Sequence, residues 1–213
     1  MTKLIIFDLD GTLVDAYPAV VKSVNDTLKK LGFPKRSHEA VKRAVGWGDR
    51  QLMAQFVGED LADKAIRLYR PHHTKTLGAP GHVKFLPGAK MLLRFLDARG
   101  YKLAIASNRP AKFTRLILKG LGIDRCFDAV VCADRAPRPK PYPDMLLAIC
   151  KRLKIKKSEA LFVGDMTIDV EAGRRAGIRT VAVATGSSTR SQLKALKPHR
   201  IITRISLIER ELS

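Results

Sequence analysis

Two aspartates follow a short apolar run near the start of the chain, and their spacing suits them to hold a cation. The run Leu4-Ile5-Ile6-Phe7 has the length and composition of a strand that is buried on both faces. Asp8 and Asp10 come directly after it, two residues apart, so an extended backbone places both carboxylates on one side. Carboxylates this close repel each other unless a metal ion or a substrate cation lies between them. The end of this strand is therefore the first candidate site.

Three more polar motifs follow at wide intervals, two of them at the ends of apolar runs. They are Ser107-Asn108 after residues 102–106, Lys140 between Pro139 and Pro141, and Gly164-Asp165 after residues 160–163, with Asp169 four residues later. Parallel strands present their carboxyl ends at one edge of a sheet, where open α/β sheets bind their ligands. Each motif alone is weak evidence for a functional site. Their number and their order together make stronger evidence.

The four motifs together resemble those of the haloacid dehalogenase-like phosphatases, whose first motif is Asp-x-Asp-Gly-Thr. The resemblance covers nearly the whole chain. It implies that Asp8 attacks phosphorus to form an aspartyl-phosphate, and that Asp10 serves the leaving oxygen as general acid and then the hydrolytic water as general base. The ammonium group of Lys140 would offset part of the negative charge of the phosphate and of the carboxylates. Dehalogenases of this superfamily lack a second acid at the position of Asp10, so its presence favours phosphoryl transfer.

The resemblance also implies a cofactor and a set of ligands. Mg²⁺ prefers oxygen ligands, and those expected are the carboxylates of Asp8 and Asp165 and the backbone carbonyl of Asp10. Asp169 is expected to orient Lys140 or a metal-bound water. The residues expected to bind the transferred phosphate are Gly11, Thr12, Ser107, Asn108 and Lys140.

The arrangement of apolar runs predicts an α/β fold, a doubly wound parallel sheet of the Rossmann-like kind with an inserted helical domain. Strands alternate with helices from about residue 83 onward. Residues 15–82 have helical periodicity and no strand signal, so we expect a core of residues 1–14 and 83–213 and a helical cap of residues 15–82. Asp49 is expected to cap a cap helix, and Ser206 with Glu209 to form the capping box of a terminal helix.

Substrate choice is expected to reside in the cap. The loop Gly46-Trp47-Gly48-Asp49-Arg50 resembles the cap loop of phosphoglycolate phosphatase-like members. Arg50 would pair with a substrate carboxylate or with sugar hydroxyls, although a surface position fits it at least as well. Trp47 would line the pocket or pack inside the cap. Adjacent residues of a helix point in different directions, so His72 and His73 are expected to be solvated or to cap a helix.

Composition narrows the cellular setting and the class of partner. The 40 basic and 20 acidic residues give a net charge of +20, which favours anionic partners. Nucleic acid would then bind weakly and without specificity, since the chain has no recognised nucleic-acid motif. The three cysteines have no metal-binding spacing and are expected to be reduced. No apolar run approaches the roughly 20 residues of a membrane span, and no signal peptide is evident, so we expect a cytoplasmic protein that does not bind membranes.

The sequence therefore favours a Mg²⁺-dependent phosphatase of a small phosphorylated metabolite, such as phosphoglycolate or a sugar phosphate. Three alternatives remain open. A sugar-phosphate mutase of the beta-phosphoglucomutase kind would use the same four motifs, and so would a pyrophosphatase or nucleotidase. A basic nucleic-acid-binding or partner-binding protein on a phosphatase scaffold would explain the charge.

Overall fold

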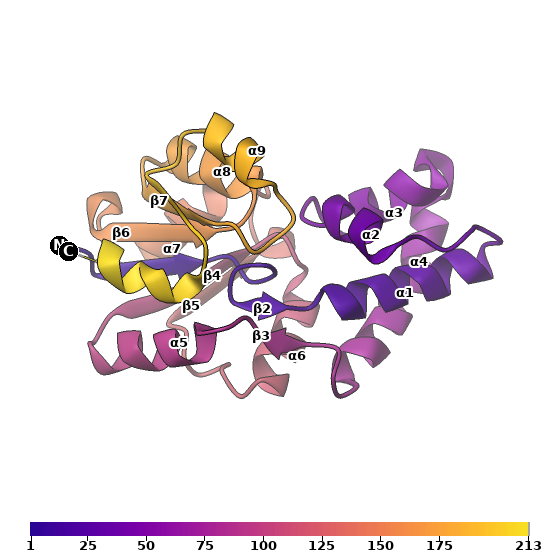
Figure 1. Cartoon of the computed structure of the whole chain (residues 1–213), viewed down its shortest axis with the longest axis horizontal. Helices are drawn as coiled ribbons and strands as arrows, with labels where there is room; N and C mark the ends of the chain where they lie inside the picture. The colour runs from indigo at the N-terminus through magenta and orange to yellow at the C-terminus, as the bar shows by residue number, and fades with distance from the viewer. Residues whose placement is uncertain (213) are drawn as a thin grey trace.

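The computed structural model describes residues 1–212, which form a layered α/β core and a helical insertion beside it (Figure 1). The core holds a six-stranded parallel sheet, as the alternation of strand and helix predicts, in the order β5-β4-β1-β6-β7-β8. The strands are β1 Leu4–Phe7, β4 Lys102–Ser107, β5 Ala129–Cys132, β6 Ala160–Gly164, β7 Arg179–Val183 and β8 Arg200–Ile202. Strand β1 therefore lies in the interior of the sheet, between β4 and β6.

Alternate residues of β1 pack on opposite faces of the sheet, which explains why the whole run is apolar. Ile5 and Phe7 join the apolar cluster beneath helices α5 and α6, whereas Leu4 and Ile6 join the cluster beneath α7 and α8. The core helices are α5 Ala89–Ala98, α6 Ala111–Gly120, α7 Asp144–Leu153, α8 Thr167–Ala176 and α9 Arg190–Ala195, with short 3₁₀ turns η1 Ala133–Arg135, η2 Lys157–Glu159 and η3 Ile205–Glu211. The fold class predicted from the sequence is thus confirmed.

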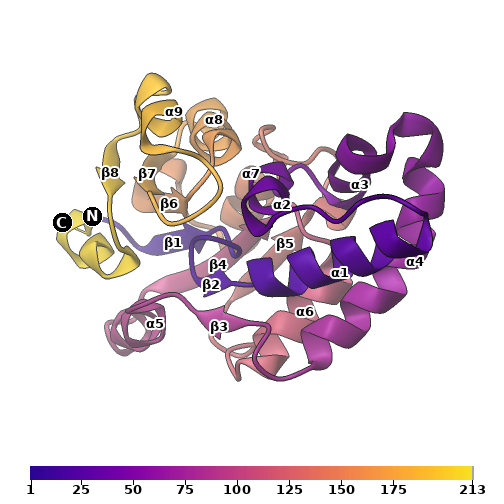
Figure 2. The same cartoon turned by 45° about the vertical axis from the view of Figure 1, so that its right-hand side comes forward.

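The insertion consists of four helices with an apolar cluster of their own. These helices are α1 Tyr17–Lys30, α2 His38–Ala44, α3 Asp49–Val57 and α4 Glu59–Gly78. Buried side chains such as Val24, Leu28 and Met53 pack together among them. Figure 2 shows the four helices gathered beside the sheet, on the side away from the N-terminus.

Two very short strands connect the insertion to the core. Strand β2 (Val14–Asp15) leads out of the core and pairs in antiparallel fashion with β3 (Lys84–Phe85), which leads back. Sequence periodicity did not predict this pair, because two residues are too few to show an alternating pattern. The outgoing and returning chains therefore lie side by side.

Two predicted helix starts are wrong. Gly48 occupies the position before α3, and Asp49 is the first helical residue, with its carboxylate directed toward Arg70 instead of capping the helix. Near the C-terminus, residues 205–211 form a 3₁₀ helix that begins after Arg204, so Ser206 lies inside it and forms no capping box with Glu209. Ser37 does cap α2, since its hydroxyl accepts a hydrogen bond from the amide of Ala40.

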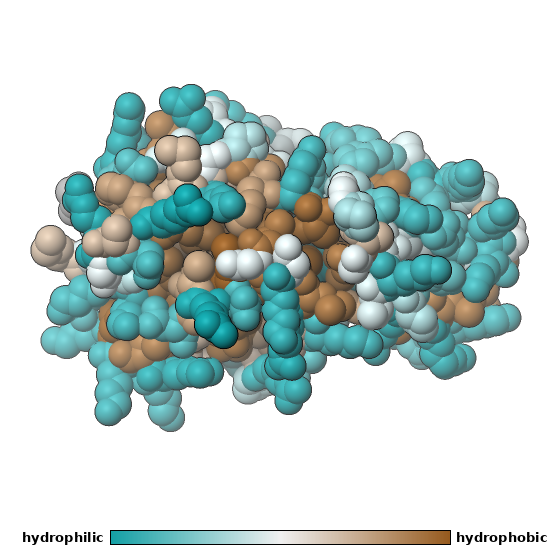
Figure 3. Space-filling model, turned by 90° about the horizontal axis from the view of Figure 1, so that it is seen from below, coloured by the Kyte–Doolittle hydropathy of each residue, from teal (hydrophilic) through white to brown (hydrophobic). Residues whose placement is uncertain are grey.

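Basic side chains project from much of the surface, and several pair locally with carboxylates, as Lys22 does with Asp26 and Arg175 with Glu171. Figure 3 shows one face on which hydrophilic side chains surround a hydrophobic region near the middle. Within residues 1–212, no helix has the combination of length and apolar character needed to cross a bilayer.

Candidate active site

The carboxyl ends of three neighbouring strands bring the candidate residues together. Strand β1 ends immediately before Asp8, β4 ends at Ser107, and β6 ends immediately before Asp165. Because these strands are parallel and adjacent, their last residues meet at one edge of the sheet. The strand pattern alone therefore accounts for the meeting of residues that are far apart in sequence.

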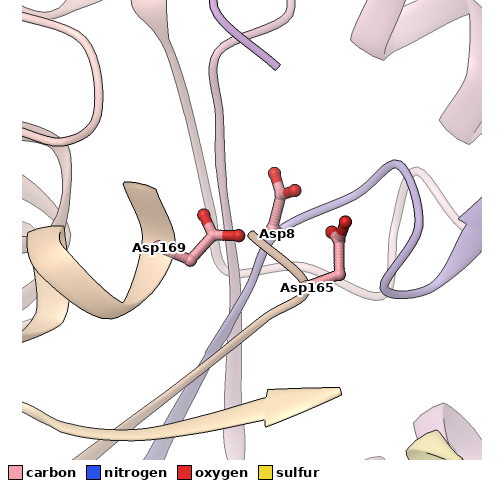
Figure 4. Close-up of side chains that lie close together, drawn as sticks. All are labelled: Asp8, Asp165 and Asp169. Carbon is pink, nitrogen blue, oxygen red and sulfur yellow. The ribbon is translucent and has the colours of Figure 1, made fainter. Parts of the chain in front are cut away.

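Three carboxylates and one ammonium group form the centre of this site. Asp8, Asp165 and Asp169 are all buried, and one carboxylate oxygen from each lies within 4.8 Å of the others (Figure 4). The Nζ atom of Lys140 lies 2.8 Å from Oδ1 of Asp8 and 2.7 Å from Oδ1 of Asp169. Among residues 1–212, no cationic side chain pairs with Asp165, which accepts hydrogen bonds from the Thr12 hydroxyl and the Ser187 amide, both at 3.0 Å.

The electrostatics of this cluster fit a divalent cation with a preference for oxygen ligands. Burial raises the pKa of Asp8 to about 6 in spite of the opposing effect of Lys140. Burial, and then the charges of Asp8 and Asp169, raise the pKa of Asp165 well above its usual value. Burial alone would lower the pKa of Lys140, but the two carboxylates raise it, so this residue stays charged. Three ionised acids with one ammonium leave a charge of −2, which one Mg²⁺ would balance.

Asp169 uses both of its carboxylate oxygens within the protein. Oδ1 lies against Lys140, and Oδ2 accepts a hydrogen bond of 2.8 Å from the amide of Met166 at the start of α8. This geometry places Asp169 in direct contact with the ammonium group of Lys140. Its role in orienting Lys140 is still a prediction.

Asn108 connects three parts of the structure through its side-chain amide. Its Oδ1 accepts from the amide of Lys140, and its Nδ2 donates to the carbonyl of Lys140, both at 2.9 Å. The same Nδ2 also lies 2.9 Å from the carbonyl oxygen of Gly46 in the helical insertion. Asn108 thus holds the backbone of the Lys140 loop and contacts the loop at Gly46 in the helical insertion.

Gly11 and Thr12 are placed differently from the expected phosphate-binding role. The amide of Gly11 donates to Val14 and that of Thr12 to Leu9, because these groups close the turn that follows β1. Gly11 has a φ of 79°, and a Cβ there would lie 2.7 Å from Oδ2 of Asp165. Neither residue lines the cavity beside Asp8. The Thr12 hydroxyl and the tight turn at Gly11 both lie against Asp165, and a role of either residue in binding phosphate stays a prediction.

Arg109 was missed in the sequence, although it directly follows the Ser107-Asn108 motif. Its Nε lies 2.7 Å from Oδ2 of Asp10, and its Nη2 lies 2.9 Å from Oδ1 of the same carboxylate. This ion pair is bidentate and nearly buried, with the two side chains 7% and 12% exposed. Burial would lower the pKa of Arg109, but Asp10 raises it, so the guanidinium is always charged. The signal that could have identified Arg109 in the sequence is its position, directly after a candidate motif at the end of a strand.

The prediction that His73 is solvated is wrong, because its imidazole is completely buried. Helix α4 points it into the junction between insertion and core, where it stacks on Tyr69 and contacts the edge of Phe113. Its Nε2 lies 2.6 Å from Nη1 of Arg109. Burial, and then the nearby guanidinium, lower the pKa of His73 to about 2, so the ring is neutral.

The two residues expected to select substrate, Trp47 and Arg50, are both absent from the cavity lining. Trp47 is half exposed. Arg50 lies on the outer surface of the insertion and pairs with Glu59 and Asp63. This is the surface position that the sequence left open, and it arises because Arg50 lies in the first turn of α3 with its side chain toward α4.

One cavity lies between the sheet edge and the helical insertion. Its core side presents Asp8, Asp10, Ser107, Arg109 and Lys140. Its other lining residues are Tyr17, Val20, Val45, Gly46, Gly48, Asp49, Leu52, Tyr69, Asn108, Met166 and Ile168. A small pocket with apolar walls and a few charged groups at one end suits a small anionic molecule.

Comparisons with known proteins agree with this geometry. A family model described as haloacid dehalogenase-like hydrolase matches residues 5–183. The chain is 32% identical over 212 residues to the Dickeya dadantii protein named "Probable phosphatase IndB", covering 97% of this chain and 91% of that one. It is 31% identical over 184 residues to a phosphoglycolate phosphatase of Aquifex aeolicus, covering 86% and 85%. A solved structure of a "predicted phosphoglycolate phosphatase" from Haemophilus somnus superimposes with a TM-score of 0.92 at 29% identity, covering 100% and 98%.

Proposed function

The chain belongs to the haloacid dehalogenase-like hydrolases and is a phosphatase, and on that premise we propose that it is a Mg²⁺-dependent phosphatase of small phosphorylated metabolites. The observation that carries the proposal is the buried cluster of Asp8, Asp165 and Asp169 around Lys140, which sets three acidic groups against one ammonium group. Asp8 and Asp165 would hold the ion together with the backbone carbonyl of Asp10. When bound, Mg²⁺ would neutralise phosphate charge and so permit a carboxylate to approach.

The chemistry then proceeds on side chains of this chain. An oxygen of Asp8 forms a bond to phosphorus, while the bond from phosphorus to the ester oxygen breaks. Asp10 gives a proton to that leaving oxygen, and later takes one from the water that hydrolyses the aspartyl-phosphate. The hydroxyl of Ser107 accepts from the amide of Arg109, so its own proton is available to a phosphoryl oxygen.

The proposal also assigns separate roles to the core and to the insertion. Residues 1–14 and 83–213 would supply the chemistry, and residues 15–82 would act as the cap that closes the cavity. The relatives named phosphoglycolate phosphatase make 2-phosphoglycolate the first substrate to try. Its carboxylate, a second anionic group beside the phosphate, fits the basic character of the chain.

Phosphate release from 2-phosphoglycolate should require Mg²⁺, which tests the proposal directly. We expect turnover in excess Mg²⁺ and loss of turnover when the ion is removed with a chelator, because Asp8 and Asp165 then face the phosphate uncompensated. Zn²⁺ should substitute poorly, since the expected ligands are all oxygens. A panel of phosphorylated metabolites assayed in parallel would rank the substrates. Full activity in excess chelator would contradict the metal assignment.

Asp10→Asn should slow turnover by about 10²–10⁴-fold, the usual contribution of general acid–base catalysis. If its larger role is to activate water, phosphorylated enzyme should accumulate, because Asp8 still attacks. Acid-quenched protein analysed for bound phosphate during turnover would detect this. Asp26→Asn, on the exposed face of α1, is the matched control and should behave as wild type. Undiminished turnover in Asp10→Asn would remove Asp10 from the mechanism.

A further inference from the structure

The cavity has two cationic side chains among its described lining residues, Lys140 and Arg109. Lys140 is held between Asp8 and Asp169 at the site of phosphoryl transfer. In the part of the chain that the structure describes, Arg109 forms an ion pair with one carboxylate, that of Asp10. Arg109 is therefore the cation whose partner can be exchanged for a second anionic group on a substrate.

The present partner of Arg109 shows what kind of group it accepts. The guanidinium binds the Asp10 carboxylate through two parallel N–H···O contacts, 2.7 and 2.9 Å long. This fork geometry matches planar carboxylates, and it is stronger and more selective than one contact. A substrate carboxylate has the same shape as the group already there.

A chain of hydrogen bonds from the helical insertion fixes Arg109 in this place. Since a guanidinium can only donate, Nε2 of His73 must accept from Nη1, which leaves the imidazole proton on Nδ1. That proton is donated to the Ser23 hydroxyl, 3.1 Å away, and the hydroxyl in turn donates to the carbonyl of Ala19 at 2.8 Å. Each contact in this chain has one donor and one acceptor, so the guanidinium is oriented by side chains of α4 and α1.

We propose that Arg109, positioned by His73, is the residue that recognises a carboxylate on the leaving group of the substrate. This inference rests on the proposed phosphatase function. The substrate carboxylate would replace Asp10 on the guanidinium, and Asp10, freed from the ion pair and protonated from solvent, would turn toward the leaving oxygen to give it that proton. Since Asp10 lies two residues from Asp8, the recognised carboxylate must lie only a few bonds from the phosphate ester.

Two substrates that differ only in the carboxylate provide the test. 2-Phosphoglycolate and ethyl phosphate have the same two-carbon skeleton, and the ratio of their kcat/KM values measures recognition of the carboxylate. In wild type we expect a ratio of about 10² or more, because a site built around a polar group rejects an analogue that lacks it. Arg109→Met should reduce the ratio toward one. A loss of Asp10 function in the variant would lower kcat/KM for both substrates by the same factor, so it would leave their ratio unchanged.

Further variants keep the test decisive. Arg109→Lys retains the charge for Asp10 and loses the fork, so it should fold and show an intermediate ratio. His73→Leu should lower the ratio, and His73→Gln should restore part of it, since its amide oxygen can accept from Arg109. Arg115→Met, which removes an exposed arginine from α6, should leave the ratio as in wild type.

Each outcome bears on a different proposal. A wild type that shows no preference for 2-phosphoglycolate over ethyl phosphate would overturn the role of Arg109, as would Arg109→Met and Arg109→Lys variants that keep the wild-type ratio. A wild type that releases phosphate from neither compound, nor from any other phosphate monoester in the presence of Mg²⁺, would overturn the phosphatase proposal itself.

Discussion

Asp8→Asn is expected to lose phosphate release by about 10⁴-fold or more, as other enzymes do on loss of their nucleophile. Asn is nearly isosteric, so the backbone of the site should keep its shape, but its amide cannot attack phosphorus. No phosphorylated protein should form during turnover. Initial rates with 2-phosphoglycolate and Mg²⁺, together with analysis of quenched protein for bound phosphate, measure both effects.

The stability of Asp8→Asn should show that its loss of activity is not a loss of fold. The pKa of Asp8 is raised to about 6 in the folded protein, so the stability tied to its proton is present below about pH 4. That stability is lost as the pH rises through 6. Metal-free wild type should therefore lose stability relative to Asp8→Asn between pH 4 and 7, a trend that thermal unfolding at several pH values would follow. Wild-type turnover in Asp8→Asn would refute the proposed nucleophile.

Lys140→Met is expected to remove activity and to lower the free energy of unfolding by about 3–5 kcal/mol, the usual cost of breaking a buried ion pair on one side. Met fills a similar volume, so the effect comes from charge. Without the ammonium group, Asp8 and Asp169 are left buried and unpaired beside Asp165. Denaturant unfolding of the metal-free protein at neutral pH measures the loss.

A second substitution separates charge imbalance from damaged packing. Lys140→Met combined with Asp169→Asn removes one charge of each sign and should recover part of the lost stability, while activity stays absent. Lys102→Met, which breaks the exposed pair with Asp128, is the matched control and should change stability little. A double variant no more stable than Lys140→Met would show that packing causes the loss.

The core and its carboxylate cluster were predictable because both follow from local patterns. Apolar runs of four to six residues mark the buried strands, and the carboxyl ends of adjacent parallel strands meet at one edge. The residues that close those runs, such as Asp8 and Asp165, must then be neighbours. The strand pattern did not predict that Lys140 lies beside these residues. The order of the motifs did.

The pairing of Arg109 with Asp10 and His73 was not predictable in this way. It depends on how helix α4 lies against the core, and a sequence pattern carries no information about that placement. Adjacent histidines on a helix suggested solvent exposure, yet α4 is partly covered by the core, so the face of His73 is buried. The same reason explains why Arg50 was considered for a role that its position on the outer face does not support.

The pairing of β2 with β3 has a consequence for how such a protein can change over time. The residues between Asp15 and Lys84 form one long loop relative to the sheet. The pairing of β2 with β3 already joins the two ends of this loop. The entropy of closing a loop rises only with the logarithm of its length, by roughly 0.6 kcal/mol for each doubling. Helices can therefore be added to or removed from this loop at small thermodynamic cost to the sheet. The architecture allows a lineage to remodel the enclosure around its substrate while the strand ends that perform the reaction stay as they are.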